Sequence, residues 1–312
     1  MESLPITPED DALHPPTLDD MWWCETHWFN FDQPGPNLST TIYPFIRKNM
    51  NIASVAVFLW DGSACEPWHV RYGRAFWQVP ISPSTDFKNL RLEGLEYDRL
   101  EPFKSYRVAY KEGDIVDMEL HFEALREPHL AHKSEHGGHL DQTCRVRGFV
   151  KLDNERIDID CFGMRDKSWG PRTDRASGRG GGAYTFGISG DDQFLVLTGP
   201  TGRNVGQSRG GGFFWRDGKK ADISRAERRV IRRRRGYPED IELQFEDSLG
   251  RQLRATGRCL NRVANQALAG TFAWLSMTEW RATDGALLIG EDQEVWTPDM
   301  LRGGSLLRLD TD

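Results

Sequence analysis

The chain has 312 residues, of which 38% are hydrophobic and 28% are charged, and its net charge at pH 7 is −7. The length suits two domains of about 150 residues each. The negative charge argues against general affinity for nucleic acid or acidic membranes, which would repel the chain. No apolar run approaches the ~20 residues that span a bilayer, and the acidic, proline-rich N-terminus lacks the pattern of a signal peptide. We therefore expect a cytoplasmic protein without an integral membrane segment.

Short alternating or β-branched runs, separated by turn signals, follow one another along the whole chain. In the first half they cover residues 51–60, 105–125 and 144–162, with turns at Asp61-Gly62, at 112–114 and at Asp153-Asn154. In the second half they cover residues 213–223, 240–259 and 278–296, with turns at Asp217-Gly218, Leu249-Gly250 and Asp284-Gly285. Asp-Gly between alternating flanks is a strong hairpin signal. The pattern predicts an all-β protein of sequential antiparallel strands, as in sandwiches or up-and-down barrels.

The arginine-rich segment 224–235 fits either a basic helix or a strand with outward-facing arginines. Because Gly236, Tyr237 and Pro238 follow it and precede another alternating run, we interpret it as a strand of a meander. Its arginines fit a solvated, charge-guarded strand face, and alternatively a surface for phosphates or an acidic partner. The glycine runs at 177–182 and 208–213 lack the spacing of a nucleotide-binding loop. The first of them sets the expected domain boundary: residues 1–172 and residues 173–312.

The chain has five cysteines, an odd number, and they are widely scattered without a CxxC pair. Such an arrangement indicates neither a disulfide framework nor a thiolate metal site, so we expect buried free thiols. The cysteines are Cys24, Cys65, Cys144, Cys161 and Cys259.

Residues 129–172 are the densest candidate for a functional site. They contain His129, His132, His136 and His139, half of all the histidines in the chain. Imidazoles this close together fit a zinc site, but neither HExxH nor thiolates accompany them and the histidine stretch has the character of a loop. We therefore expect hydrogen-bonding roles and no metal.

Asp166 follows an alternating run and precedes a break rich in proline and glycine, which predicts a position at a strand end. Arginines, a lysine and a tryptophan surround it in sequence. Paired with an arginine, this carboxylate would be structural and its pKa would be lowered. Facing an apolar, aromatic cavity, its pKa would be raised and the group could donate a proton. The residues alone leave both alternatives open.

The run from His136 to Arg172 resembles the signature of a bacterial family with two tandem lipocalin-like domains. The resemblance lies in His139 followed by Asp141-Gln142, in the hairpin at 146–153 and in RDKSWGPR at 165–172. The run GEDQEVW at 290–296 is similar to a late motif of the same family. Wider relatives are the carotenoid 1,2-hydratases (hydroxyneurosporene synthases), AttH-like proteins and tocopherol cyclases.

The resemblance implies two tandem lipocalin-like antiparallel β-barrel domains and a carboxylate that protonates an alkene. The position that matches this carboxylate is Asp166. One departure is Lys167, which stands where the family usually has histidine. Fold transfers across such a distance better than reaction does.

These observations favour a cofactor-independent hydratase, dehydratase, isomerase or cyclase that acts by acid–base chemistry on an apolar isoprenoid or polycyclic molecule. Asp166, sheltered from water, would give the proton, and Glu291, or His139 with Gln142, would take the final proton or orient water. Indole faces would stabilise a developing cation. The other candidate residues for substrate binding are Arg165, His136, Trp169, Trp280 and Trp296.

Two other functions remain open from the sequence. A carrier or sensor of a hydrophobic ligand would use the same fold with Asp166, Arg165 and Arg172 as a structural ion-pair network. A scaffold would instead dock an acidic partner on the arginines of 228–235. A homodimer is compatible with the sequence.

Overall fold

The computed structural model describes residues 4–17, 19–63, 69–172, 181–199, 205–208, 211–268 and 271–297. The chain divides into two compact units, Met1–Leu59 with Arg71–Thr173 (unit 1) and Trp60–Val70 with Asp174–Asp312 (unit 2). Among the described residues the only helices are the short 3-10 turns η1 (Pro8–Asp11) and η2 (Lys48–Met50). No helix in these ranges is long and apolar enough to cross a membrane. The protein is all-β, with two barrel-like sheets, as the sequence predicts.

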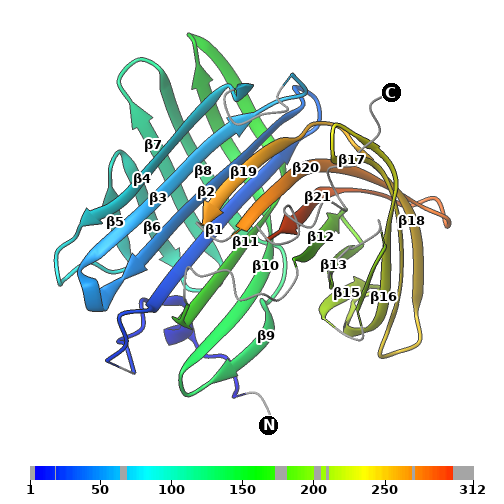
Figure 1. Cartoon of the computed structure of the whole chain (residues 1–312), viewed down its shortest axis with the longest axis horizontal. Helices are drawn as coiled ribbons and strands as arrows, with labels where there is room; N and C mark the ends of the chain where they lie inside the picture. The colour runs from blue at the N-terminus through cyan, green and yellow to red at the C-terminus, as the bar shows by residue number, and fades with distance from the viewer. Residues whose placement is uncertain are drawn as a thin grey trace. The chain divides into compact units, whose positions relative to one another are not determined.

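The sheet of unit 1 is curled and has two open edges. Its strands lie in the order β4-β3-β2-β1-β11-β10-β8-β7-β6-β5, and β9 pairs with β10 (Figure 1). All the pairings between successive strands are antiparallel. The strands are β1 (Trp23–Gln33), β2 (Leu38–Arg47), β3 (Ile52–Trp60), β4 (Tyr72–Pro80), β5 (Asn89–Leu92), β6 (Leu95–Glu101), β7 (Ser105–Glu112), β8 (Val116–Ala124), β9 (His129–Ser134), β10 (Gly137–Leu152) and β11 (Glu155–Pro171).

The sheet of unit 2 closes on itself. Within the described ranges, β16-β15-β13-β12-β21-β20-β18-β17 form a ring because β17 pairs back onto β16, while β14 and β19 lie off the ring. The strands are β12 (Gly182–Ile188), β13 (Gln193–Thr198), β14 (Val205–Ser208), β15 (Gly212–Arg216), β16 (Lys219–Arg234), β17 (Tyr237–Asp247), β18 (Gln252–Cys259), β19 (Val263–Leu268), β20 (Thr271–Ala282) and β21 (Leu287–Trp296).

The predicted hairpins form where the turn residues indicate. Asp153 and Asn154 both have positive φ, as do Asp217 and Gly218, which is the backbone that a two-residue type I′ turn requires. The first of these turns joins β10 to β11, whose register runs without interruption from Gly138↔Trp169 to Leu152↔Glu155. This long hairpin places His139, Asp141 and Asp166 on the same ladder.

Each unit has its own apolar core. The core of unit 1 lies inside the curl and includes Phe29, Phe31, Tyr97, Phe122 and Val146. The core of unit 2 includes Phe194, Phe214, Phe245 and Trp280. Four cysteines are buried free thiols, as expected; the fifth, Cys65, lies outside the described residues.

The arginine-rich segment is a strand, β16, as interpreted from the sequence, but it is not purely a solvated face. Arg228 is fully buried and its guanidinium contacts the Asp292 carboxylate at 2.7 and 2.6 Å. Arg233 donates to Glu294 at 2.7 Å, and Arg232 pairs with Asp240 at 2.6 Å. Residues 177–180 and 209–210 of the glycine runs lie outside the described residues.

A side chain at position 257 would crowd the core of unit 2. Gly257 lies opposite Trp280, and a Cβ at this position would come within 2.4 Å of the indole ring. We expect Gly257→Ala to lower the free energy of unfolding of unit 2 by about 1–3 kcal/mol through overpacking. Urea unfolding followed by tryptophan fluorescence measures this loss. The control is Gly190→Ala, where a Cβ would meet nothing within 4 Å; equal effects of the two substitutions would contradict the prediction.

Candidate active site

Strand β11 carries ionisable side chains on both of its faces. Arg165 and Lys167 point to the side of the unit 1 core, since their antiparallel partners on β1 are Phe29 and His27. Asp166 and Ser168 therefore point to the other side, here called the Asp166 face. Asp166 lies inside β11, which continues to Pro171, so the predicted strand-end position is wrong.

The Asp166 face brings together two predicted site residues, Asp166 and His139, with Asp141. Asp141 is the β10 partner of Asp166, and His139, two residues before Asp141, shares its face. The His139 Nε2 atom lies 3.1 Å from Asp141 Oδ1. One ligand atom from each of the three residues lies within 4.8 Å of the others. The histidine stretch is thus strand β9 and the start of β10, where the sequence indicated a loop.

The carboxyl of Asp166 has no hydrogen bond or ion pair within the described part of the chain, and its Oδ1 atom is buried. Burial raises the pKa of Asp166 to about 6, further raised by Asp141 and opposed by the cations His139, Arg172 and Arg165. The clamped, structural alternative for this carboxylate requires a lowered pKa and a guanidinium in contact. Neither is found.

His139 has the opposite shift. Burial alone would lower the pKa of this imidazole, but the contact with Asp141 and the charge of Asp166 outweigh burial and raise the pKa to about 9. At neutral pH the site therefore holds an imidazolium beside a carboxyl group that changes its charge near pH 6. Two neighbouring groups with pKa values pushed apart are the usual arrangement of an acid and a base.

Two further residues complete the polar part of this face. Arg172 donates from Nη2 to Ser168 Oγ at 3.1 Å and from Nη1 to the Tyr43 hydroxyl at 3.4 Å. Ser168 Oγ is also 2.8 Å from Thr26 Oγ1 on β1. Burial raises the pKa of Tyr43, so its hydroxyl remains a proton donor.

Exposure distinguishes these groups from their surroundings. Most side chains of the face are buried, among them Thr26, Trp28, Asp141, Thr143 and Met164. Tyr43, His139, Asp166 and Arg172 are each partly exposed.

The opposite, core-side face of β11 is occupied by buried ion pairs with structural partners. Arg165 contacts Asp11 at 2.9 Å, Gln142 Oε1 at 2.8 Å and His27 Nε2 at 2.6 Å. Burial, followed by the charge of Arg165, holds the pKa of His27 well below its usual range, so this imidazole is neutral. The amide of Gln142 donates to two backbone carbonyl groups, which fixes it as part of this network.

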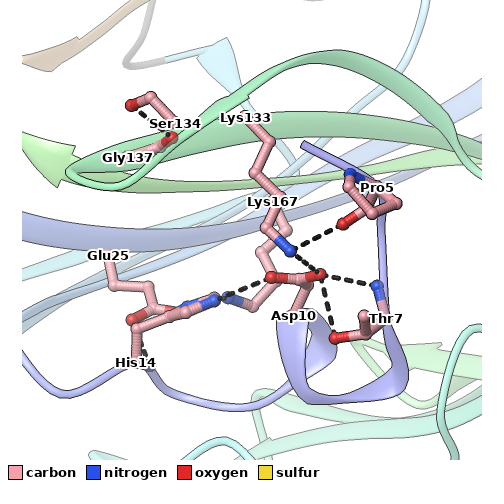
Figure 2. Close-up of polar contacts among 9 residues, drawn as sticks. All are labelled: Pro5, Thr7, Asp10, His14, Glu25, Lys133, Ser134, Gly137 and Lys167. Atoms are coloured by element: carbon pink, nitrogen blue, oxygen red, sulfur yellow. Dashed lines mark hydrogen bonds and ion pairs between the residues drawn. The ribbon is translucent and has the colours of Figure 1, made fainter. Parts of the chain in front are cut away.

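Lys167 belongs to a second buried network, which Figure 2 shows together with the N-terminal segment. Its ammonium group is paired with Glu25, which also accepts from the backbone N–H of His14 at 2.8 Å. Asp10 accepts from Lys133 Nζ at 2.6 Å and lies 3.3 Å from His14 Nε2. The N-terminal segment is thereby tied to β1, β9 and β11 through charged contacts.

The structure separates the remaining predicted residues from Asp166 or places them in unit 2. Trp169 is on the core side of β11, where its ring stacks on His14 at 4.3 Å and lies 5.0 Å from Lys167 Nζ. His136 is exposed and its Nδ1 atom lies 3.2 Å from the Thr17 hydroxyl.

Three predicted site residues lie in unit 2. Glu291 is buried and accepts from Gln293 at 2.6 Å. Trp280 is buried in the core and donates to the Phe186 carbonyl at 3.0 Å. Trp296 packs in a smaller aromatic cluster with Tyr237 and Trp274.

Sequence reasoning missed two participants of the Asp166 face. Asp141 carried a signal, because a histidine and an aspartate two residues apart on a strand share a face. Tyr43 carried none, since only the pairing of β2 with β1, Phe29↔Ile42 and Thr26↔Phe45, brings it to the site.

The set His139, Asp141 and Asp166 also has the donors of a divalent cation site. One imidazole and two carboxylates suit Mg²⁺, Mn²⁺, Fe²⁺ or Zn²⁺. Of the four clustered histidines only His139 takes part; the ring of His132 stacks beside it with centroids 6.5 Å apart.

Comparisons with known proteins agree with this architecture. The family profile described as "Domain of unknown function (DUF7064)" matches residues 7–291. The chain belongs to the DUF7064 family. No curated protein sequence matches it.

Solved structures share the fold of this DUF7064 chain. A putative AttH from Nitrosomonas europaea has a TM-score of 0.63 at 12% identity, covering 87% of this chain and 91% of that one. CghA has a TM-score of 0.58 at 10% identity, covering 94% and 96%. Kievitone hydratase from Nectria haematococca has a TM-score of 0.58 at 11% identity, covering 88% and 89%. At these identities the likeness concerns the fold, and it agrees with the AttH-like part of the resemblance noted in the sequence.

The raised pKa of Asp166 predicts an unusual mutational effect on stability. Because the folded-state pKa is about 6, above its ordinary value of 3.8, the stability present below about pH 4 is lost as the pH rises through 6. Asp166→Asn removes the charge, so we expect the variant to be more stable than the parent by roughly 1–3 kcal/mol at pH 8 and to show no such gain at pH 4.

Chemical unfolding at a series of pH values measures this difference. The exposed Asp158→Asn serves as the control and should show no comparable pH-dependent gain. Destabilisation by Asp166→Asn at pH 8 would mean that the carboxylate is held by cations after all.

Proposed function

We propose that this protein is a lyase that adds or removes water at a carbon–carbon bond of a hydrophobic small molecule by acid–base chemistry. The observation that carries the proposal is the joint, partial exposure of Asp166 and His139 on one face, with pKa values of about 6 and about 9. The fold shared with a protein named as a hydratase adds support. The apolar side chains of the same face, Trp28, Phe45 and Met164, suit a hydrophobic substrate.

In the dehydration direction, the Asp166 carboxylate removes a proton from carbon. The His139 imidazolium gives a proton to the departing hydroxyl group, which leaves as water. Asp141 stabilises the imidazolium and orients its ring through the 3.1 Å contact. Hydration uses the same groups in reverse, with Asp166 as the acid. Isomerisation would need only the proton transfer at carbon.

The chemistry predicts that both Asp166→Asn and His139→Gln lower kcat by about 10²–10⁴-fold, because each removes one proton-transfer group. The assay incubates the protein with a panel of prenylated phenols, polyprenyl alcohols and β-hydroxy ketones in H₂¹⁸O and detects gain or loss of water by mass spectrometry. Asp158→Asn is the control. A chelator should leave turnover unchanged, since the proposed steps need no cation. Full activity of both variants would refute the roles assigned here, and a panel compound that binds the parent without any water exchange would favour a carrier.

The two pKa values also predict the pH dependence of dehydration. The base must be ionised and the acid protonated, so kcat/KM should rise as the pH passes about 6 and fall as it passes about 9. Steady-state rates across this range measure the profile. A profile in which kcat/KM does not fall above about pH 9 would contradict the role of His139 as the acid. In Asp141→Asn this fall should move to lower pH, because the variant loses the carboxylate that raises the pKa of His139.

A further inference from the structure

The groups beside Asp166 are the Asp141 carboxylate, which is paired with His139, and the Arg172 guanidinium, whereas Trp280 and Trp296, two of the tryptophans expected to stabilise a carbocation, are buried in clusters of unit 2. Trp169 is on the core side of β11 and its neighbour there is the Lys167 ammonium group. Trp28 is the indole on the Asp166 face that pairs with Asp166 in register, and its N–H donates to Thr41 Oγ1 at 2.6 Å. On the same face stand the Arg172 guanidinium and the His139 imidazolium.

The sign of these charges bears directly on the intermediate that the site can stabilise. The His139 imidazolium is paired with the Asp141 carboxylate, so the charge that acts on a substrate is that of the Arg172 guanidinium, which would repel a positive charge developing on carbon. A negative charge developing on oxygen would be stabilised by this guanidinium and by any hydroxyl donor within reach. The arrangement therefore suits an oxyanion rather than a carbocation.

We propose that the substrate has a carbonyl group next to the carbon that Asp166 deprotonates, and that Arg172 and Tyr43 bind the oxygen of the resulting enolate. This inference rests on the proposed function of the acid–base pair and adds the substrate class: a β-hydroxy carbonyl compound in one direction and its α,β-unsaturated product in the other.

The geometry of Arg172 fits this role. Its guanidinium is oriented by Ser168 at 3.1 Å and Tyr43 at 3.4 Å, and its backbone N–H donates to the Trp22 carbonyl at 2.8 Å. Both side-chain partners are neutral, and no carboxylate forms an ion pair with Arg172 within the described part of the chain. The positive charge is therefore not neutralised by a contact and remains available to an anionic oxygen.

Tyr43 complements the guanidinium. Its oxygen accepts the hydrogen bond from Arg172 Nη1, so its own proton can be donated to a ligand. A phenol polarised by a cation is a stronger donor than an isolated one.

The step balances without any further reactant. The Asp166 carboxylate takes the proton from the carbon next to the carbonyl, and the electron pair of that C–H bond moves onto the carbonyl oxygen. The pair then returns to form the carbon–carbon double bond as the C–O bond of the β-hydroxyl breaks. His139 supplies the proton that makes the hydroxyl leave as water. Asp166 then releases the proton that it took from carbon, and His139 takes up a proton through solvent, so both groups regain their starting states.

Two probes of opposite charge test the substrate class on the full-length protein. Dimedone is an enolate anion at neutral pH and its O-methyl enol ether is the neutral analogue, while the ammonium ion of dimethylprenylamine mimics a tertiary carbocation. We expect dimedone to bind more tightly than either other probe in calorimetric titrations. Arg172→Met should weaken dimedone binding by tenfold or more, Arg172→Lys by less, and Tyr43→Phe severalfold.

The matched control is Arg145→Met, an arginine further along β10 whose guanidinium pairs with Asp160 at 2.6 Å; it should leave dimedone binding unchanged. Circular dichroism establishes that each variant is folded. Tighter binding of the ammonium ion than of dimedone, or equal dimedone binding by folded Arg172→Met and the parent, would overturn the enolate inference. Neither result would touch the proposed lyase function, which fails separately if Asp166→Asn and His139→Gln retain full turnover.

Discussion

The structure of unit 1 depends on how the buried charges of strand β11 are compensated. A charge moved out of water costs several kcal/mol unless a partner replaces the lost hydration. On the core side, Arg165 meets Asp11 and Lys167 meets Glu25, and all four side chains are at most 1% exposed. The acids come partly from the N-terminal segment, which explains why this segment is ordered against the sheet although η1 has only four residues. On the other side Asp166 has no such partner, so the same strand carries a compensated face and a chemically available one.

The separation of the two faces follows from the two-residue period of a strand. Moving the β10–β11 hairpin by one residue would bring Arg165 to the side of His139 and bury Asp166 against the core. Register is held by the fifteen consecutive pairs of this hairpin and by its two-residue turn at Asp153-Asn154. Unit 2 shows the same way of compensating charge in its own barrel, where Arg228 is paired with Asp292 and lies 3.4 Å from Glu294. In both units, then, arginine inside a β-sheet structure appears together with carboxylates from neighbouring strands.

The sequence predicted the strands and hairpins well because their determinants are local. Alternation and the turn residues at 153–154 and 217–218 act over a few positions, and the structure confirms them. It also directed attention to Asp166 and His139. The sequence could not predict on which face of the sheet Trp169 lies. The strand was expected to end near Asp166, so the alternation of faces was not continued through residues 165–169. It could not find Tyr43, whose approach to Arg172 spans 129 positions in the chain. Local patterns therefore indicated the candidate site, whereas pairing between distant strands determined which side chains share its face.

This difference matters for chemistry, because the composition of the site changes the sign of the charge it can stabilise. An aspartate surrounded by indoles would suit a cation on carbon, which was the expectation from Trp169, Trp280 and Trp296. An aspartate that shares its face with His139, Arg172 and Tyr43 suits an anion on oxygen. The proposed acid–base pair is the same in both cases, so the fold shared with one protein named as a hydratase is compatible with either. The neighbouring cations distinguish them: Arg172 lowers the energy of an enolate and raises that of a carbocation for the same reason that it opposes the raised pKa of Asp166.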